Sequence, residues 1–330
     1  MHTNITAMST YKNKIQSALS LCLDQTNLPL GEKYQGKVRD SYDLGDQILL
    51  ITTDRLTAFD RQLALIPFKG AVLNLTSAWW FEQTAKLIPN HIIAVPDPNV
   101  VIAKKCSVFP IEFVVRGYIS GTTSTSLWTQ YKNGVRDYCG IRFPDGLKKN
   151  QKLSEPVLTP TTKETIHDRP IAPAEIISEG WMKEEDWLEA SALALKLYHR
   201  GVDLAAKHGL ILVDTKYEFG RDKAGNIIVV DEIHTPDSSR YWLAESYEAR
   251  IAEGLEPENI DKEFLRLWFS KNSDPYTDEK MPEAPQELIE ELSSRYIQLY
   301  ERITGNNFCF ADHEEPAEQR IMRNIANYLR

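Results

Sequence analysis

Residues 210–233 read LILVDTKYEFGRDKAGNIIVVDEI, and this stretch decides the fold. It contains two runs rich in aliphatic, β-branched and aromatic side chains, separated by a short turn that contains glycine. Such a pattern predicts a β-hairpin. With Ala224 and Gly225 as a two-residue tip, Glu218 is expected opposite Asp231 on the partner strand.

The two faces of this hairpin differ in character. Alternation puts Asp214, Lys216 and Glu218 on one face and the apolar or aromatic side chains between them on the core face. Two carboxylates directly opposite each other repel, and a divalent cation between them removes that cost. Carboxylate oxygens suit Mg²⁺. The pattern therefore indicates either a magnesium site on Glu218 and Asp231 or a solvated face whose charges gather near Lys216.

Hydrophobic spacing in the rest of the chain predicts an α+β protein with a mostly antiparallel sheet. Residues 145–174 are rich in Pro, Lys and Thr, which indicates a connector or an active-site loop. The predicted helices cover residues 9–25, 70–87, 184–208, 261–270, 285–304 and 316–329, and the predicted strands cover residues 47–53, 91–95, 100–104 and 111–119.

Composition and charge exclude several classes of protein. The formal net charge of -9 argues against a nucleic-acid-binding protein, which needs a basic surface. The four cysteines are far apart and form no CxxC pair, so neither a zinc site nor a disulfide framework is expected. No apolar run approaches the length of a signal peptide or a membrane span. We expect a cytoplasmic protein without a membrane partner.

A basic turn at residues 36–40 reads GKVRD, between two short predicted strands. Gly36 permits close approach of the backbone to a phosphate. Lys37 and Arg39 point the same way if the run is extended. The turn is not a P-loop, because no GxxxxGK[ST] motif is present. It is either a phosphate site or a solvated basic hairpin.

A second group of candidate residues begins at Arg116, which ends an apolar strand where an unpaired charge is costly. A turn rich in glycine and hydroxyl residues follows and leads into a helix predicted at residues 125–131. Hydroxyls and free amides at a helix N-terminus can bind an anion, whereas capping needs only one hydroxyl. The excess of hydroxyls beside Arg116 favours anion binding.

A third group lies at residues 231–242, which read DEIHTPDSSRYW. A strand runs here into a proline turn dense with acceptors and hydroxyls. Asp237 either binds a ligand or caps the turn. Arg240 either binds an anion or stacks on the aromatic residues that follow it.

At these motifs the chain resembles the phosphoribosylaminoimidazole-succinocarboxamide synthase, or SAICAR synthetase, family. The similarity extends from about residue 28 to residue 305, and the spacing of the last two motifs is highly specific. The matching runs are GKVRD (36–40), PIEFVVRGYISG (110–121), TPTTK (159–163), DTKYEFG (214–220) and DEIHTPDSSRYW (231–242).

The resemblance implies an N-terminal lobe similar to that of protein kinases, a C-terminal α/β lobe, and ATP in the cleft between them. It implies the conversion of carboxyaminoimidazole ribotide, L-aspartate and ATP into succinocarboxamide ribotide, ADP and phosphate in purine biosynthesis. The implied cofactors are ATP and Mg²⁺, and the implied partners are small molecules, with a monomer or homodimer expected. The expected domains are an ATP-binding lobe (1–120), a substrate and metal lobe (121–305) and a helical tail (306–330) that packs or forms an interface.

The resemblance also implies roles for individual residues, and it places adenine against the backbone of residues 105–112. The roles of Lys163, His167 and Asp168 stay open, because the connector is shorter here than in the fungal members. Residues expected to bind the nucleotide are Gly36, Lys37, Arg39, Glu112, Lys216, Glu218 and Asp231, with the last two as magnesium ligands. Residues expected around the ribotide are Arg116, Ser120, Thr122, Asp237, Ser239 and Arg240. Residues expected in catalysis are Lys37, Lys216 and Asp214.

The motifs and the resemblance both indicate phosphoryl transfer to a carboxylate. A carboxylate does not react with an amine at neutral pH, whereas an acyl phosphate does, and the protein would chiefly position groups and neutralise charge. A small-molecule kinase with the same ATP lobe remains an alternative. A catalytically inactive nucleotide-binding module is a third reading, against which the acidic pair, Lys37 and both arginines argue.

Overall fold

The computed structural model describes residues 4–59, 61–123, 125–164, 168–260, 262–274, 277–310 and 315–329. The chain divides into two compact units, each of which has its own sheet. The first unit comprises Met1–Trp79, Ile92–Lys105 and Ile260–Arg330, and the second comprises Trp80–His91 and Cys106–Asn259. The domain boundaries expected at residues 120 and 305 stay predictions. The mixture of helices and antiparallel sheets confirms the expected α+β class.

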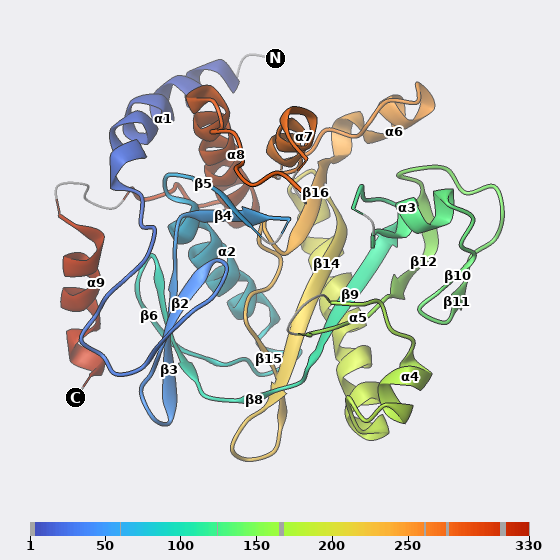
Figure 1. The fold of residues 1–330 in the computed structure, drawn as a ribbon, viewed down its shortest axis with the longest axis horizontal. Coiled ribbons are helices and arrows are strands. Elements are labelled where there is room, and N and C mark those ends of the chain that lie inside the picture. The colour runs from blue at the N-terminus through green and yellow to red at the C-terminus, as the bar shows by residue number, and fades with distance from the viewer. Residues whose placement is uncertain are drawn as a thin grey trace. The chain divides into compact units, whose positions relative to one another are not determined.

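The first unit is built on an antiparallel sheet with the strand order β1-β2-β3-β7-β6 (Figure 1). The basic GKVRD turn joins β1 to β2, as predicted, and a separate hairpin of β4 and β5 follows β3. The strands are β1 (Lys33–Gln35), β2 (Arg39–Asp43), β3 (Gln47–Thr52), β4 (Arg55–Ala58), β5 (Arg61–Leu65), β6 (Ile92–Asp97) and β7 (Val100–Lys104).

Helices of the first unit supply most of its core. Their apolar faces meet in one cluster that includes Ile15, Val72, Leu292 and Tyr296, all nearly inaccessible to solvent. The helix predicted at residues 9–25 ends at Ala18, and one turn of the 3₁₀ helix η1 (Leu19–Leu21) follows it. The helices are α1 (Asn4–Ala18), α2 (Lys69–Thr84, of which the residues up to Trp79 lie in this unit), α7 (Glu263–Asn272), α8 (Gln286–Thr304) and α9 (Ala317–Ile325), followed by η2 (Ala326–Tyr328).

The helical tail packs on the first unit. Helix α9 lies against β6, and its Ile321 and Ile325 join the buried cluster that contains Leu49 and Ile51 of β3. Packing is one of the two roles expected for the tail.

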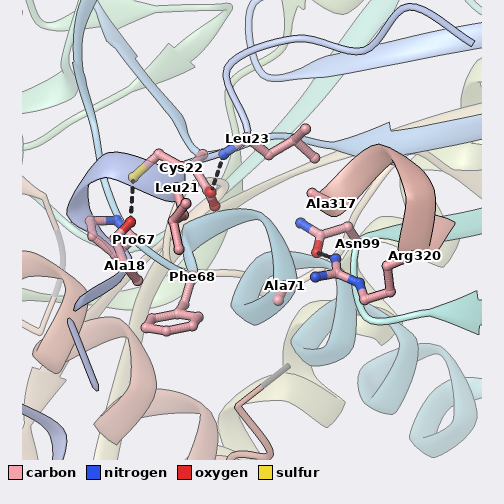
Figure 2. Close-up of a pocket in the computed structure, with 11 residues that line it drawn as sticks. Ala18, Leu21, Cys22, Leu23, Pro67, Phe68, Ala71, Asn99, Ala317 and Arg320 are labelled. Atoms are coloured by element: carbon pink, nitrogen blue, oxygen red, sulfur yellow. Dashed lines mark hydrogen bonds between the residues drawn. The ribbon is translucent and has the colours of Figure 1, made fainter. Parts of the chain in front are cut away.

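A small cavity lies between the η1 segment, α2 and α9 of the first unit (Figure 2). In Figure 2, Arg320 of α9 donates to the neighbouring side chain of Asn99, and the Cys22 thiol donates to the carbonyl of Ala18. Its volume is about 50 Å³, which is room for a few water molecules but not for a nucleotide.

The second unit is built on an antiparallel sheet around the long strand β14 (Figure 1). Strand β9 pairs with one side of β14, while β16 and β15 pair with different parts of it. The strands are β8 (Ser107–Val108), β9 (Ile111–Tyr118), β10 (Asp137–Tyr138), β11 (Ile141–Arg142), β12 (Lys152–Leu158), β13 (Thr161–Thr162), β14 (Leu210–Arg221), β15 (Ile227–Val230) and β16 (Ser239–Leu243).

Helix α5 covers the apolar face of this sheet by packing on β14 and β9. The ring of Trp187 stacks on Phe113 at a centroid distance of 5.2 Å, and Phe219 meets Phe113 edge-on. No helix within the described ranges is long and apolar enough to cross a membrane. The helices are α3 (Leu127–Lys132), α4 (Pro173–Ser178), α5 (Glu184–Lys207) and α6 (Ala244–Ala252).

The connector predicted at residues 145–174 is more ordered than expected. It contains β12 and β13, both of which pair with β9. The pairing of β12 shifts register between Lys152 and Val157, and Pro156 lies within this bulge. Proline cannot donate a ladder hydrogen bond and is tolerated at bulges. The proline content of this segment therefore indicated a loop where the strand β12 is present.

The predicted hairpin is present, but its predicted register was wrong by one residue. Glu218 pairs with Val230 and not with Asp231. The loop has three residues at its tip, because the side chain of Asp222 accepts hydrogen bonds from the amides of Ala224 and Asn226. Gly225 takes a left-handed conformation with φ of 86°, as this loop type requires.

Candidate active site

The polar face of the second unit's sheet carries the residues that alternation selected on β14. Asp214, Lys216 and Glu218 follow one another at every second position. On β9, Arg116 lies opposite Asp214, and Glu112 lies on the same face. Because α5 covers the other face, these charged side chains are gathered on one side of one sheet.

A row of three charged residues crosses β9, β14 and β16. The carboxylate of Asp214 accepts a hydrogen bond from Nη1 of Arg240 at 2.8 Å, and Nη1 of Arg116 lies 3.6 Å from the same oxygen. The side chains of Arg116 and Asp214 are each 12% exposed, and that of Arg240 is 19% exposed. One carboxylate therefore orients two guanidinium groups in a partly buried setting.

Hydroxyl groups complete this row. Ser120 accepts a hydrogen bond from Arg240 at 2.8 Å and lies 3.4 Å from Asp214. Nε of Arg116 donates to Oγ1 of Thr159 at 2.8 Å. Thr159 belongs to the TPTTK motif, and its part in this row was not predicted. Thr122 is exposed and Ser124 lies outside the described residues. Helix α3, which begins beyond them, has six residues and is too short to provide an N-terminal anion site.

Lys216 is the centre of a second group of charges. Its Nζ lies 2.9 Å from a carboxylate oxygen of Glu112, 2.9 Å from one of Glu218 and 3.8 Å from one of Asp231. Lys163, whose role the sequence left open, forms an ion pair with the other oxygen of Glu218. Two ammonium groups and three carboxylates thus share one region of the sheet.

Charge interactions in this group outweigh the effect of burial. Burial alone would lower the pKa of Lys216, but the carboxylates of Glu218, Glu112 and Asp231 raise it well above its ordinary value. Burial would raise the pKa of Glu112, but the charge of Lys216 lowers it overall. Lys216 therefore stays an ammonium ion at neutral pH and is not suited to act as a general base.

The DEIHTPDSSR loop is held in an unusual backbone conformation. Asp231 and His234 have left-handed φ values of 64° and 55°. The buried imidazole of His234 forms a hydrogen bond of 2.5 Å with the hydroxyl of Tyr217, and the carbonyl of His234 accepts one from Tyr241 at 2.8 Å. Such conformations in residues other than glycine are costly and cluster at functional sites.

The same loop contains two further candidates. The amide of Asp237 donates to Oγ1 of Thr235 at 3.3 Å, so the side chain that caps this turn is that of Thr235, and the role of the Asp237 side chain stays a prediction. Ser239 pairs with Thr215 on β14, and their hydroxyls are 2.7 Å apart. Ser239 therefore lies on the opposite face of β16 from Arg240. Of the connector residues, Asp168 accepts a hydrogen bond from the amide of Glu164 at 3.0 Å, and His167 lies outside the described residues.

The GKVRD turn lies in the first unit. Lys37 is exposed, Arg39 is half-buried, and Nε of Arg39 lies 3.3 Å from Oγ1 of Thr52. The amide of Gly36 donates to the carbonyl of Arg39 at 2.8 Å, which closes the turn. The turn thus exposes the side chain of Lys37 at its tip, and its main chain is closed by the hydrogen bond from Gly36 to Arg39.

The two sets of charges in the second unit suit different ligands. Two guanidiniums around one carboxylate leave a net positive charge that suits a phosphate or carboxylate. The three carboxylates of the second set surround the ammonium group of Lys216. The family model described as SAICAR synthetase matches residues 32–283. The chain belongs to the SAICAR synthetase family. It is therefore an ATP-dependent ligase of purine biosynthesis, as expected from its motifs.

Individual members of the SAICAR synthetase family agree with this assignment. The phosphoribosylaminoimidazole-succinocarboxamide synthase of Legionella pneumophila (strain Paris) is 67% identical over 311 residues, which cover 94% of this chain and all of that protein. The structure of SAICAR synthase from Saccharomyces cerevisiae complexed with SAICAR has a TM-score of 0.74 and 31% identity, covering 87% of this chain and all of that one. A SAICAR synthetase in complex with ADP has a TM-score of 0.64 and 27% identity, covering 84% of this chain and all of that one. These likenesses confirm the expected fold.

Proposed function

We propose that this chain joins L-aspartate to carboxyaminoimidazole ribotide with the use of ATP, forming succinocarboxamide ribotide, ADP and phosphate. The observation that carries the proposal is the row in which Asp214 orients Arg116 and Arg240. Such a row suits a substrate with both a carboxylate and a phosphate. The names of the related proteins, one solved with the product and one with ADP, give it further support.

The proposed chemistry has two steps. In the first, a carboxylate oxygen of the ribotide attacks the γ-phosphorus of ATP, and the bond from that phosphorus to the β,γ-bridging oxygen breaks to release ADP. In the second, the amine of aspartate attacks the acyl carbon, loses a proton, and displaces phosphate that carries one former carboxylate oxygen. The protein contributes by positioning the reactants and by stabilising charge.

The proposed ribotide site is the polar face around Asp214. Arg116 and Arg240 bind its carboxylate or its 5′-phosphate, and Ser120 lies within hydrogen-bond reach of the same groups. Asp214 acts by holding both guanidiniums in place. Thr122 and Asp237 complete the site, whereas Ser239 supports it from the opposite face of β16, because its hydroxyl is bonded to Thr215 and its amide to the carbonyl of Thr235.

The proposed nucleotide contacts lie partly in the first unit. Gly36 lets the turn approach a phosphate, and Lys37 and Arg39 draw charge from the phosphate oxygens. Adenine meets the main chain within residues 105–112. Lys216 remains positively charged and keeps Glu112 and the metal carboxylates in position.

The donor set fits a magnesium ion held by Glu218 and Asp231. Both supply carboxylate oxygens, and both lie within 4 Å of one ammonium group, so they already share a cation. Across the described ranges no group of three or more His, Cys, Asp or Glu could hold a metal ion. Two carboxylates with substrate phosphates and water are a usual Mg²⁺ environment. An ion held by Glu218 and Asp231 would supply positive charge that neutralises the phosphates of ATP.

The experiment that tests the function is an assay with purified protein and each combination of substrates. ADP and succinocarboxamide ribotide should form together only when ATP, the ribotide and aspartate are all present. A phosphorylated ribotide that accumulates without aspartate would indicate a kinase. Absence of any ADP formation would leave only a binding module.

A further inference from the structure

The side chain of Arg55, the first residue of β4, is buried beneath the GKVRD turn. Only 2% of it is exposed. Its guanidinium donates to the carbonyls of Gly36 at 3.1 Å and Lys37 at 3.3 Å, and also to the carbonyl of Asp24. A fourth hydrogen bond, of 2.8 Å, reaches the carboxylate of Asp40. Three of its four acceptors are thus main-chain oxygens, two of them in the turn.

The charge of Arg55 is balanced by Asp40, which is fully buried. Burial would raise the pKa of Asp40, but hydrogen bonds from the main chain of Thr26 and from Arg55 lower it overall. Lys33 lies 3.3 Å from the same carboxylate. The ion pair is therefore maintained at neutral pH. The guanidinium is held both by the carboxylate of Asp40 and by the main-chain carbonyls.

These contacts determine which way the peptide groups of the turn face. The carbonyls of Gly36 and Lys37 face Arg55, and that of Val38 accepts hydrogen bonds from the amide and hydroxyl of Thr53 at 3.0 and 2.7 Å. All peptide bonds described are trans. In a trans peptide the carbonyl and the following amide point in opposite directions. The amides of Lys37 and Val38 consequently face away from Arg55, and the side chain of Lys37 is exposed to solvent.

We infer that Arg55 is a positioning residue for ATP, although its side chain does not reach the ligand. This inference rests on the proposed function, in which the GKVRD turn binds phosphate. By holding the carbonyls of Gly36 and Lys37 on the inner side, Arg55 keeps two amides and the Lys37 side chain directed at the phosphate oxygens. Consecutive amides arranged in this way form an anion-binding concavity. A lysine could not replace Arg55, because one ammonium group cannot serve acceptors spread over a planar fork.

The test compares Arg55→Lys with the wild type and with Arg61→Lys. Arg61, on the neighbouring strand β5, donates instead to the carbonyl of Asp278. Arg55→Lys should raise the KM for ATP and the dissociation constant of ADP by about tenfold or more, which corresponds to one lost hydrogen bond to a charged group. The KM values for the ribotide and aspartate should stay within about twofold, and Arg61→Lys should change none of them.

A second variant keeps the inference testable if Arg55→Lys fails to fold. Thr53→Val preserves the shape of a buried side chain and removes one of the two hydrogen bonds to the carbonyl of Val38. It should weaken ADP binding by a few-fold without affecting the ribotide. An unchanged ADP affinity in a folded Arg55→Lys protein, or in Thr53→Val where the former does not fold, would overturn the inference. Wild-type protein that makes no succinocarboxamide would instead refute the proposed function.

Discussion

Asp214 and Arg240 lie opposite each other on β14 and β16, and their side chains form a salt bridge of 2.8 Å. Arg116 approaches the same carboxylate from β9 on the other side. Because strands of one sheet fix all three residues, the two guanidiniums are held in place before any ligand arrives. This rigidity is what a site for an anionic substrate requires.

Arg240→Ala should therefore impair ribotide binding selectively. The loss of one charge-assisted hydrogen bond costs about 1.5–3 kcal/mol, which raises the KM for the ribotide by roughly ten- to a hundredfold. The KM for ATP should change little. Steady-state kinetics measure both, with Arg221→Ala as control, since Arg221 at the end of the neighbouring strand β14 pairs with Asp186 instead. Equal increases for ATP and the ribotide would assign Arg240 to ATP or to the fold.

Removal of either proposed magnesium ligand should strongly impair catalysis without unfolding the protein. Glu218→Gln and Asp231→Asn should each weaken Mn²⁺ binding in the presence of ADP by about tenfold or more, and should lower ADP formation by about a hundredfold. Electron paramagnetic resonance of Mn²⁺ reports the binding directly. Glu155→Gln, at an exposed position of β12, is the control. Normal turnover in both variants would exclude this metal site.

The buried His234 predicts a specific dependence of stability on pH. Burial lowers the pKa of His234 to about 3, whereas its ordinary value is 6.5. Between these values the unfolded chain binds a proton that the folded protein does not, so stability is lost as the pH falls from 6.5 toward 3. The expected slope is about 1.4 kcal/mol per pH unit.

His234→Gln should remove this contribution. Urea unfolding at several pH values between 4 and 7 should give a slope that is shallower than that of the wild type by about 1.4 kcal/mol per unit. The variant should also be less stable at pH 7, because it loses the hydrogen bond to Tyr217. His199→Gln, at an exposed position of α5, controls for the loss of an imidazole. Identical slopes for His234→Gln and the wild type would contradict this interpretation.

The tail should contribute to stability through one arginine. Arg320 of α9 binds the fully buried carboxylate of Asp97 at 2.9 and 3.2 Å, whereas Arg323 on the same helix pairs at the surface with Glu315. Arg320→Ala should lower the free energy of unfolding by on the order of 3 kcal/mol, because it leaves a buried charge without its cation. Arg323→Ala should lower it by less than about 1 kcal/mol. Chemical denaturation distinguishes them, and equal losses would argue against the role given to Arg320.

Helices and strands whose apolar residues recur at a regular spacing were predictable from the sequence. Helix α5 was predicted within a residue of its observed end, and β7 at its observed ends, because each buries a continuous apolar face. Strand β12 was missed, since Pro156 and a bulge hide its pattern. The register of β14 and β15 was wrong because the side chain of Asp222 sets the loop length. A local side-chain hydrogen bond of this kind does not change the spacing of apolar residues, so the sequence pattern does not reveal the loop length.

The candidate site was predictable where its residues share a strand. Alternation along β14 was enough to group Asp214, Lys216 and Glu218 on one face. Thr159 and Lys163 join them only because their segment pairs with β9, and chain spacing does not reveal that pairing. Arg55 was not singled out, because arginine is usually exposed and its burial depends on Asp40 and on three main-chain carbonyls.

Transfer of oxygen from the ribotide carboxylate to phosphate tests the proposed reaction most directly. Carboxyaminoimidazole ribotide labelled with ¹⁸O in its carboxylate is incubated with the protein, ATP, Mg²⁺ and aspartate, and the released phosphate is analysed by mass spectrometry. We predict one labelled oxygen in each phosphate and one phosphate for each succinocarboxamide, because the amine displaces the phosphate together with a carboxylate oxygen. Unlabelled phosphate would contradict activation of the carboxylate by phosphorylation.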